Sequence, residues 1–268
     1  MRRDDNDRAD DAAAARQDLH RFLAELTAAP DARVLDLGCG DGATLEELVG
    51  RIGAGGWLVG IDRNPRALVT AATMLADAPR WLLLRADLAR PLPIATASVD
   101  RVLCHNTLEA LADPAGLLAE AHRVLRPGGL AVIGHSDFDT LVYAGGDLAL
   151  TRALVHTYCD QQQPGWMDAV DGTIGRRLPA LVGRSPLHVR QVHAQILLEQ
   201  AYEPGTLGFT LAKGVVAMAA RSGRFTTAEL DGWLASLAAA AANGGYLFSI
   251  NDYIVLAAAD SPSPSALA

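Results

Sequence analysis

The sequence predicts an α/β fold in which a parallel sheet carries helices on both faces. Three observations lead to this prediction. Short, almost wholly apolar segments alternate with segments of helical periodicity from residue 33 to residue 136. Strands of that kind are typical of parallel sheets covered on both faces. Gly-rich and Pro-rich stretches separate the segments, and half of the 268 residues are hydrophobic, which is enough for a sizeable core.

The elements of the first half are expected in a regular order. Residues 1–10 are charged and predicted to be disordered. A helix is predicted over residues 11–28, since Leu19, Phe22 and Leu23 recur on one face, and Pro30 ends it. Pro127-Gly128-Gly129 is predicted to form a tight turn. The remaining expected elements are strands at 32–38, 57–62, 81–87, 99–106 and 129–136 and helices at 44–51, 65–77 and 115–125.

The pattern is looser after residue 136. We expect a single domain over residues 11–260, with 31–137 as its cofactor-binding core, 11–30 as a capping helix and 261–268 as a tail. Residues 139–184 and 200–243 are predicted to be helical additions that build an acceptor site. The second addition contains a helical pair, and Thr226 or Thr227 is suited to cap its second helix. Strands are expected at 187–200 and 246–259.

Composition disfavours several classes of protein. The formal net charge is −8, so the surface as a whole repels nucleic acid and anionic membranes. No run of about 18 apolar residues predicts a membrane span. Three cysteines without a C-x-x-C pair predict neither a disulfide framework nor a zinc site, and no metal site is expected. With no signal-peptide pattern at the N-terminus, the expected compartment is the cytoplasm.

The stretch Val34–Gly42, VLDLGCGDG, combines a glycine turn with two acids. Its G-x-G-x-x-A spacing, with Asp62 ending the next strand, fits a dinucleotide-binding turn, so a nicotinamide or flavin enzyme is a candidate. However, Asp36 and Asp41 oppose a bound pyrophosphate. A carboxylate about 4 Å from a phosphate costs about 1 kcal/mol in water and several when partly buried. A cationic cofactor such as S-adenosylmethionine fits better, with Asp36 facing its ammonium group and Asp62 its ribose hydroxyls.

This stretch resembles the first motif of the class I S-adenosylmethionine-dependent methyltransferases. Four further stretches agree with that family in order and spacing, and together they cover about residues 20–140: GIDRNP, RADLARPLP, VDRVLCHNTLEAL and LRPGGLAVIG. Within the family, the chain looks most like the branch that methylates quinones and secondary metabolites. The resemblance implies a Rossmann-like, doubly wound sheet of seven mostly parallel strands, with an antiparallel last strand and a helical cap.

The resemblance also assigns roles to residues. The cofactor, S-adenosylmethionine, leaves as S-adenosylhomocysteine. Asp87 is placed near the adenine amino group and Leu88 against the ring. Asp41 faces the cofactor's ammonium group or only caps the following helix. The full set of expected cofactor-binding residues is Asp36, Gly38, Gly40, Asp41, Asp62, Arg63, Asp87, Leu88, His105 and Asn106.

Candidate acceptor residues follow the fifth expected strand. His135 is a possible general base, needed only if the nucleophile is protonated, and Asp137 lies beside it in sequence. Tyr143 is expected to contact the acceptor, Trp166 to floor its pocket and Arg176 to pair with an acidic group on it. For each residue a purely structural role remains the alternative.

Three other functional classes remain open. A nicotinamide oxidoreductase is allowed by the glycine spacing. A nucleic-acid methyltransferase is disfavoured by the charge and by His-Asn-Thr-Leu at the end of the fourth strand, where such enzymes carry an Asn/Asp-Pro-Pro-aromatic motif. A non-catalytic cofactor-binding partner protein is the third. The leading prediction is an enzyme, monomeric or homodimeric, that methylates an O, N or C atom of a small-molecule acceptor.

Overall fold

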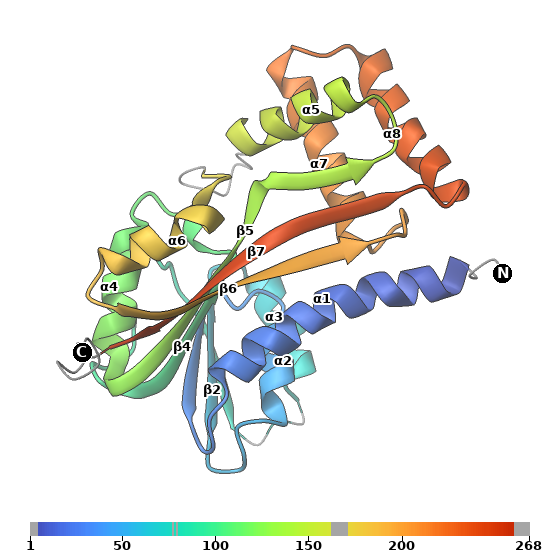
Figure 1. The fold of residues 1–268 in the computed structure, drawn as a ribbon. Helices are drawn as coiled ribbons and strands as arrows, with labels where there is room; N and C mark the ends of the chain where they lie inside the picture. The colour runs from blue at the N-terminus through green and yellow to red at the C-terminus, as the bar shows by residue number, and fades with distance from the viewer. Residues whose placement is uncertain (1–4, 77, 79, 162–170, 260–268) are drawn as a thin grey trace, which may run out of the picture. The chain divides into compact units, whose positions relative to one another are not determined.

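The computed structural model describes residues 5–76, 78, 80–161 and 171–259. Helices and strands alternate along the first half of the chain (Figure 1). The helices are α1 (Asp5–Thr27), α2 (Ala43–Val49), α3 (Pro65–Met74), the 3-10 turn η1 (Leu108–Ala110), α4 (Pro114–Val124), α5 (Leu148–Gln161), α6 (Ile174–Gly183), α7 (Leu207–Ser222) and α8 (Thr227–Ala242). The strands are β1 (Arg33–Leu37), β2 (Trp57–Asp62), β3 (Trp81–Arg85), β4 (Val99–His105), β5 (Leu125–Ala144), β6 (His188–Glu199) and β7 (Leu247–Ala258).

The strands form one seven-stranded sheet in the order β3-β2-β1-β4-β5-β7-β6. Strand β1 pairs in parallel with β2 and β4, and the parallel ladder continues to β3 on one side and β5 on the other. The final strands are antiparallel. The expected Rossmann-like sheet is therefore confirmed. The strand order reverses direction at β1 and β4, and ligands of such sheets bind where the carboxyl ends of the strands meet at that point.

The chain divides into two compact units. We call residues 20–135, 176–193 and 253–268 the core unit, and residues 1–19, 136–175 and 194–252 the helical unit. In the core unit, α2 and α3 lie on one side of β1–β4 and α4 lies on the other (Figure 1). This arrangement puts all the glycine-turn residues and their neighbouring strand ends in one unit.

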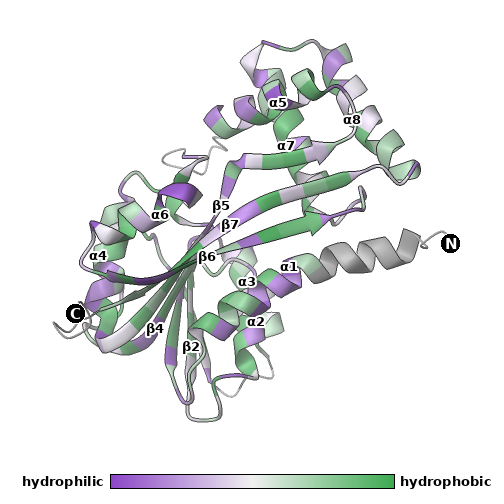
Figure 2. Ribbon diagram, in the orientation of Figure 1, coloured by the Kyte–Doolittle hydropathy of each residue, from purple (hydrophilic) through white to green (hydrophobic). Residues whose placement is uncertain are grey.

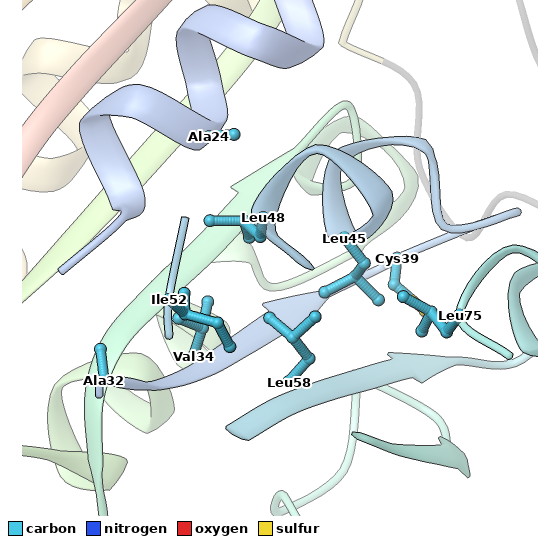
Figure 3. Close-up of a cluster of buried hydrophobic side chains, with 9 residues drawn as sticks. All are labelled: Ala24, Ala32, Val34, Cys39, Leu45, Leu48, Ile52, Leu58 and Leu75. Carbon is cyan, nitrogen blue, oxygen red and sulfur yellow. The ribbon is translucent and has the colours of Figure 1, made fainter. Parts of the chain in front are cut away.

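A cluster of apolar side chains fixes the base of the glycine turn. Leu45 and Leu48 of α2 are fully buried and extend toward the sheet, and Cys39 of the turn joins the same cluster (Figure 3). The complete cluster is Ala24, Ala32, Val34, Cys39, Leu45, Leu48, Ile52, Leu58 and Leu75. Because protein interiors are close-packed, this cluster ties the orientation of α2, and hence of the turn before it, to β1 and β2.

Local signals set the starts of the helices. Asn64 caps α3 by accepting from the backbone N–H of Arg66 at 3.0 Å, and Pro65 occupies the first helical position. Thr226 caps α8 through a complete capping box with Glu229, so the predicted cap is confirmed at the first of its two alternatives. In the helical unit, hydrophobic residues run along most of α8 (Figure 2), and Trp233 on this helix is buried.

Three sequence expectations differ from the structure. The turn expected at Pro127–Gly129 lies within β5, where the ladder with β4 shifts register and Gly128 has a φ of +78°. Between the pairs Val99–Leu125 and Arg101–Leu130, β4 advances two residues and β5 five, so this irregularity takes up three extra residues without ending the strand. Strand β5 then runs to Ala144, so residues 139–144, expected to be helical, are extended. Leu141 and Tyr143 are buried there while Val142 is exposed, the alternation of a strand. Helix α1 begins at Asp5, earlier than expected.

None of the helices over the described residues is both long and apolar enough to cross a membrane.

Candidate active site

The glycine turn joins β1 to α2 and is held by the neighbouring strand. The carbonyl of Ile61 at the end of β2 accepts from the backbone N–H groups of Gly38 at 2.8 Å and Cys39 at 3.0 Å. Gly38 and Gly40 have φ values of +81° and +54°, which side-chain-bearing residues rarely adopt. The sequence therefore places glycine where the backbone conformation requires it.

Thr107 closes the turn from the side of β4. Its hydroxyl lies 3.2 Å from the carbonyl oxygen of Leu37 and 3.0 Å from that of His105, and it donates its hydrogen to this pair. A Cβ atom on Gly38 would lie only 2.1 Å from this oxygen. Asn106, just before it, has a φ of +48°, a left-handed conformation that asparagine tolerates. Thr107 was missed from sequence, although a polar residue directly after a core strand was the available signal.

Asp36 is the most unusual acid of the site. Its side chain lies in β1, next to Leu103 of β4 in the parallel register, and is only 4% exposed. No residue that the structure describes donates a hydrogen bond to this carboxylate. Burial, and secondarily the negative charge of Asp62, raise the pKa of Asp36 to about 8. Ionisation of this buried acid is therefore unfavourable among the residues that the structure describes.

Asp62 links β2 to the turn. One carboxylate oxygen accepts from the backbone N–H of Gly40 at 3.0 Å, and the other accepts from that of Asn64 at 2.7 Å. Each oxygen keeps a second lone-pair direction for a further donor. The carboxylate is therefore oriented by the backbone and partly exposed, which suits a group that faces the hydroxyls of a ribose.

The other expected cofactor residues lie at the same end of the sheet. Asp87 is exposed just beyond β3 and accepts from the backbone N–H of Ala89 at 3.0 Å, while Leu88 beside it is 8% exposed. Arg63 is exposed after Asp62. Asp41 is exposed as well, but the N-cap of α2 is Gly42 and no side chain caps this helix, so the capping alternative for Asp41 was wrong.

A buried acid–imidazole pair lies behind the end of β4. Nε2 of His135 contacts a carboxylate oxygen of Glu109, and both side chains are buried. Burial acts to raise the pKa of Glu109, but His135 opposes it through charge and hydrogen bonding, and His105 contributes charge, so the pKa is lowered overall. His105 itself is partly exposed. The structure thus brings His105, Glu109 and His135 together within the core unit.

Helix α1 adds a residue that sequence reasoning missed. Nδ1 of His20 lies 2.8 Å from Oγ1 of Thr44, in the first turn of α2. The His20 ring also meets that of His105 edge-on, with centroids 6.2 Å apart. A histidine on an otherwise apolar helical face was the signal for it in the sequence.

The remaining expected residues lie elsewhere. In the helical unit, Tyr143 is buried, donates to the carbonyl of Gly208 at 3.1 Å and packs against Trp233, which makes it part of that unit's core. Burial raises its pKa well above the ordinary value. Asp137 is fully buried in the same unit. Arg176 is exposed in α6, and Trp166 lies outside the described residues.

Within the residues that the structure describes, no three His, Cys, Asp or Glu side chains are placed to hold a metal ion.

The comparisons with known proteins agree with this geometry. Residues 35–133 match the family described as methyltransferase domain. This part of the chain is therefore similar to a methyltransferase domain. The matched segment begins within β1 and ends within β5, so it contains the glycine turn, Asp62, Asp87 and His105.

Proteins similar to this chain include an uncharacterised protein and a named enzyme. An uncharacterised 37.1 kDa protein in transposon Tn4556 of Streptomyces fradiae is 35% identical over 168 residues, 63% of this chain and 47% of that protein. A ubiquinone biosynthesis O-methyltransferase of Parvibaculum lavamentivorans is 35% identical over 103 residues, 38% of this chain and 40% of that enzyme. The chain thus spans less than half the length of either relative.

A solved structure shares the fold over most of the chain. It is a putative methyltransferase from Bacillus halodurans, with a TM-score of 0.59 and 14% sequence identity, and the match covers 89% of this chain and 99% of that one. At this low sequence identity, the match shows that the two proteins share a fold.

Proposed function

We propose that this protein binds S-adenosylmethionine at the glycine turn and transfers its methyl group to a small molecule. The observation that carries the proposal is Asp36, a buried carboxylate for which the described residues supply no donor. A cofactor that brings an ammonium group would favour the ionised form of this acid and gain energy from it, whereas a pyrophosphate would gain none. The nicotinamide alternative is therefore not favoured.

The other residues fit the same cofactor. Asp62 retains acceptor capacity for a ribose diol after its two backbone hydrogen bonds. Leu88 offers an apolar surface and Asp87 an exposed carboxylate at the end of β3, suited to the ring and amino group of adenine. The bound cofactor would supply a methyl group already activated by a positively charged sulfur. The task of the chain's own residues is then to hold that group and the acceptor in line.

We further propose that the acceptor is a small molecule. The net charge of −8 argues against nucleic acid as substrate. The ubiquinone O-methyltransferase relative supports an acceptor of that size class and favours transfer to oxygen. Where the nucleophile carries a proton, His135 is our choice for the base, with Glu109 orienting its ring through Nε2.

Ligand binding and turnover test the proposal in separate steps. Isothermal titration calorimetry with S-adenosylhomocysteine and with NAD should show binding of the first alone. Asp36→Ala should weaken binding, while Glu46→Ala, at an exposed position of α2, serves as the matched control. Binding of NAD and not of S-adenosylhomocysteine would refute the assignment.

The acceptor is sought by mass spectrometry, as a gain of one methyl group across a panel of phenols, amines and quinols. With the acceptor in hand, His135→Ala and His135→Asn should lower kcat, and the decline of kcat at low pH that protonation of the base causes in the wild-type protein should disappear. An unchanged pH profile of kcat would remove His135 from this role.

A further inference from the structure

At the β3 edge of the core unit, one face of the sheet is left open to solvent. The chain passes from β3 to β4 through residues 86–98, and none of these residues is helical. On the opposite face, Trp81 and Leu83 pack against the apolar cluster that lies between α2 and the sheet. Because successive side chains of a strand alternate between its faces, Leu82 and Leu84 lie on the open face.

The open face is apolar. In the parallel register, Leu82 lies beside Val59 of β2, and Leu84 lies beside Ile61. Leu82 is 44% exposed, and Trp57, at the start of β2 on the same face, is 41% exposed. Neighbouring exposed apolar side chains of this kind are typical of protein–protein contact surfaces.

The backbone of β3 is also suited to pairing. Strand β3 ends the order of the sheet, so no strand within the described part of the chain pairs with its outer edge. Proteins commonly block such an edge with a lysine, a proline or a bulge. Trp81–Arg85 contains neither lysine nor proline, and its register with β2 is regular. The edge is therefore able to accept a further strand.

We propose that β3 pairs with β3 of a second copy of this chain, antiparallel about Leu83, so that the two sheets join. The strand is complementary to itself in this register. On the open face, Leu82 of each protomer lies opposite Leu84 of its partner. On the other face, Arg85 lies opposite Trp81, which allows a cation–π contact. Arg85 is the one charged residue of the strand, so no like charges oppose each other, and a two-fold axis makes each contact twice.

Sedimentation equilibrium tests the dimer. Leu82→Lys places a charge against an apolar partner in both halves of the interface, so it should raise the dimer dissociation constant about a hundredfold. The matched control is Ile196→Lys, at a residue that is 67% exposed on β6, the opposite edge strand, and it should leave the dimer intact. The proposal is wrong if the wild-type protein stays monomeric, if Leu82→Lys leaves a dimer intact, or if Ile196→Lys dissociates it.

A cysteine at position 83 tests the register, also if Leu82→Lys does not fold. At the two-fold axis the two Cα atoms of this residue would lie about 5 Å apart, within the span of a disulfide. Leu83→Cys should therefore give a reducible covalent dimer with oxidised glutathione on a non-reducing gel. For Arg85→Cys, the control, the two positions would lie about 13 Å apart along the strands, too far to bridge. The native cysteines are buried. Cross-linking of both variants to the same extent, or of neither, would contradict pairing about Leu83.

Discussion

Replacing Asp36 with asparagine tests the electrostatics of the site directly. The Asp36 side chain is 4% exposed, and burial together with Asp62 raises its pKa from 3.8 to about 8. The folded protein therefore binds one more proton than the unfolded chain between these two values. By linkage, this group's contribution to stability is fully present below pH 3.8 and is lost as the pH rises toward 8.

The size of the effect follows from the same shift. Each pH unit between the two pKa values changes the free energy of unfolding by about 1.4 kcal/mol. Between pH 3.8 and pH 7 the wild-type protein should lose about 4 kcal/mol relative to Asp36→Asn, which cannot ionise. The informative quantity is the change in this difference with pH, because the new amide adds an energy that does not depend on pH.

Urea unfolding of the ligand-free proteins between pH 5 and pH 8.5 measures the difference. The free energy of unfolding of Asp36→Asn should rise relative to that of the wild-type protein as the pH rises. For Asp41→Asn, at an exposed position, the difference from the wild-type protein should not change with pH. Parallel curves for Asp36→Asn would show that Asp36 ionises in the folded protein as it does in the unfolded chain. The argument from burial would then be wrong.

The same carboxyl group should report ligand binding. At pH 7 a group with a pKa of about 8 is about nine tenths protonated. An ammonium group placed against it favours the ionised form, so binding of S-adenosylhomocysteine should release nearly one proton. Calorimetry in phosphate and in Tris, whose ionisation enthalpies differ, counts the released proton, and Asp36→Asn should release none.

Three further substitutions test the surroundings of the site and the fold. Gly38→Ala should destabilise the protein more than Gly40→Ala in thermal melts, because both positions bear left-handed strain of about 1 kcal/mol but only Gly38 would also meet Thr107. Glu109→Gln should lower the free energy of unfolding by about 3 kcal/mol near neutral pH, because it breaks a buried pair. Since the pKa of Glu109 is lowered from 4.5, this difference from the wild-type protein should shrink as the pH falls below 4.5, which urea unfolding across that range measures. Thr226→Ala should cost about 1 kcal/mol in urea unfolding through the lost cap of α8, with Thr227→Ala as the control.

Much of the core unit could be predicted from the sequence because its signals are local. Apolar strands, glycine at left-handed positions and Asn64-Pro65 at a helix start each act within a few residues. Strand β5 was predicted too short for the same reason. Pro127-Gly128-Gly129 reads locally as a turn, and only the paired register of β4 shows that the strand continues through a bulge.

The site was predictable where it depends on strand ends, and not where it depends on packing between distant segments. Asp36 and Asp62 stand at the carboxyl ends of their strands, which pattern reveals. The contact of His20 with Thr44 joins residues 24 positions apart, and that of Glu109 with His135 joins residues 26 apart. Spacing along the chain carries no sign of such pairs. Tyr143, by contrast, was predicted to contact the acceptor because it follows the fifth expected strand. In the structure its hydroxyl donates to the carbonyl of Gly208 in the core of the helical unit.

The glycine turn and the buried acid work together as one preorganised site. Ile61, Asp62 and Thr107 hold the turn from two neighbouring strands, so its geometry does not depend on a ligand. The same rigidity keeps Asp36 in its buried position, where ionisation is unfavourable until a cation arrives. A turn with this shape alone would accept either a phosphate or a cationic cofactor. A cation gains energy from the ionised form of Asp36, whereas an anion meets a group that stays protonated and gains nothing from it, and this difference selects between them.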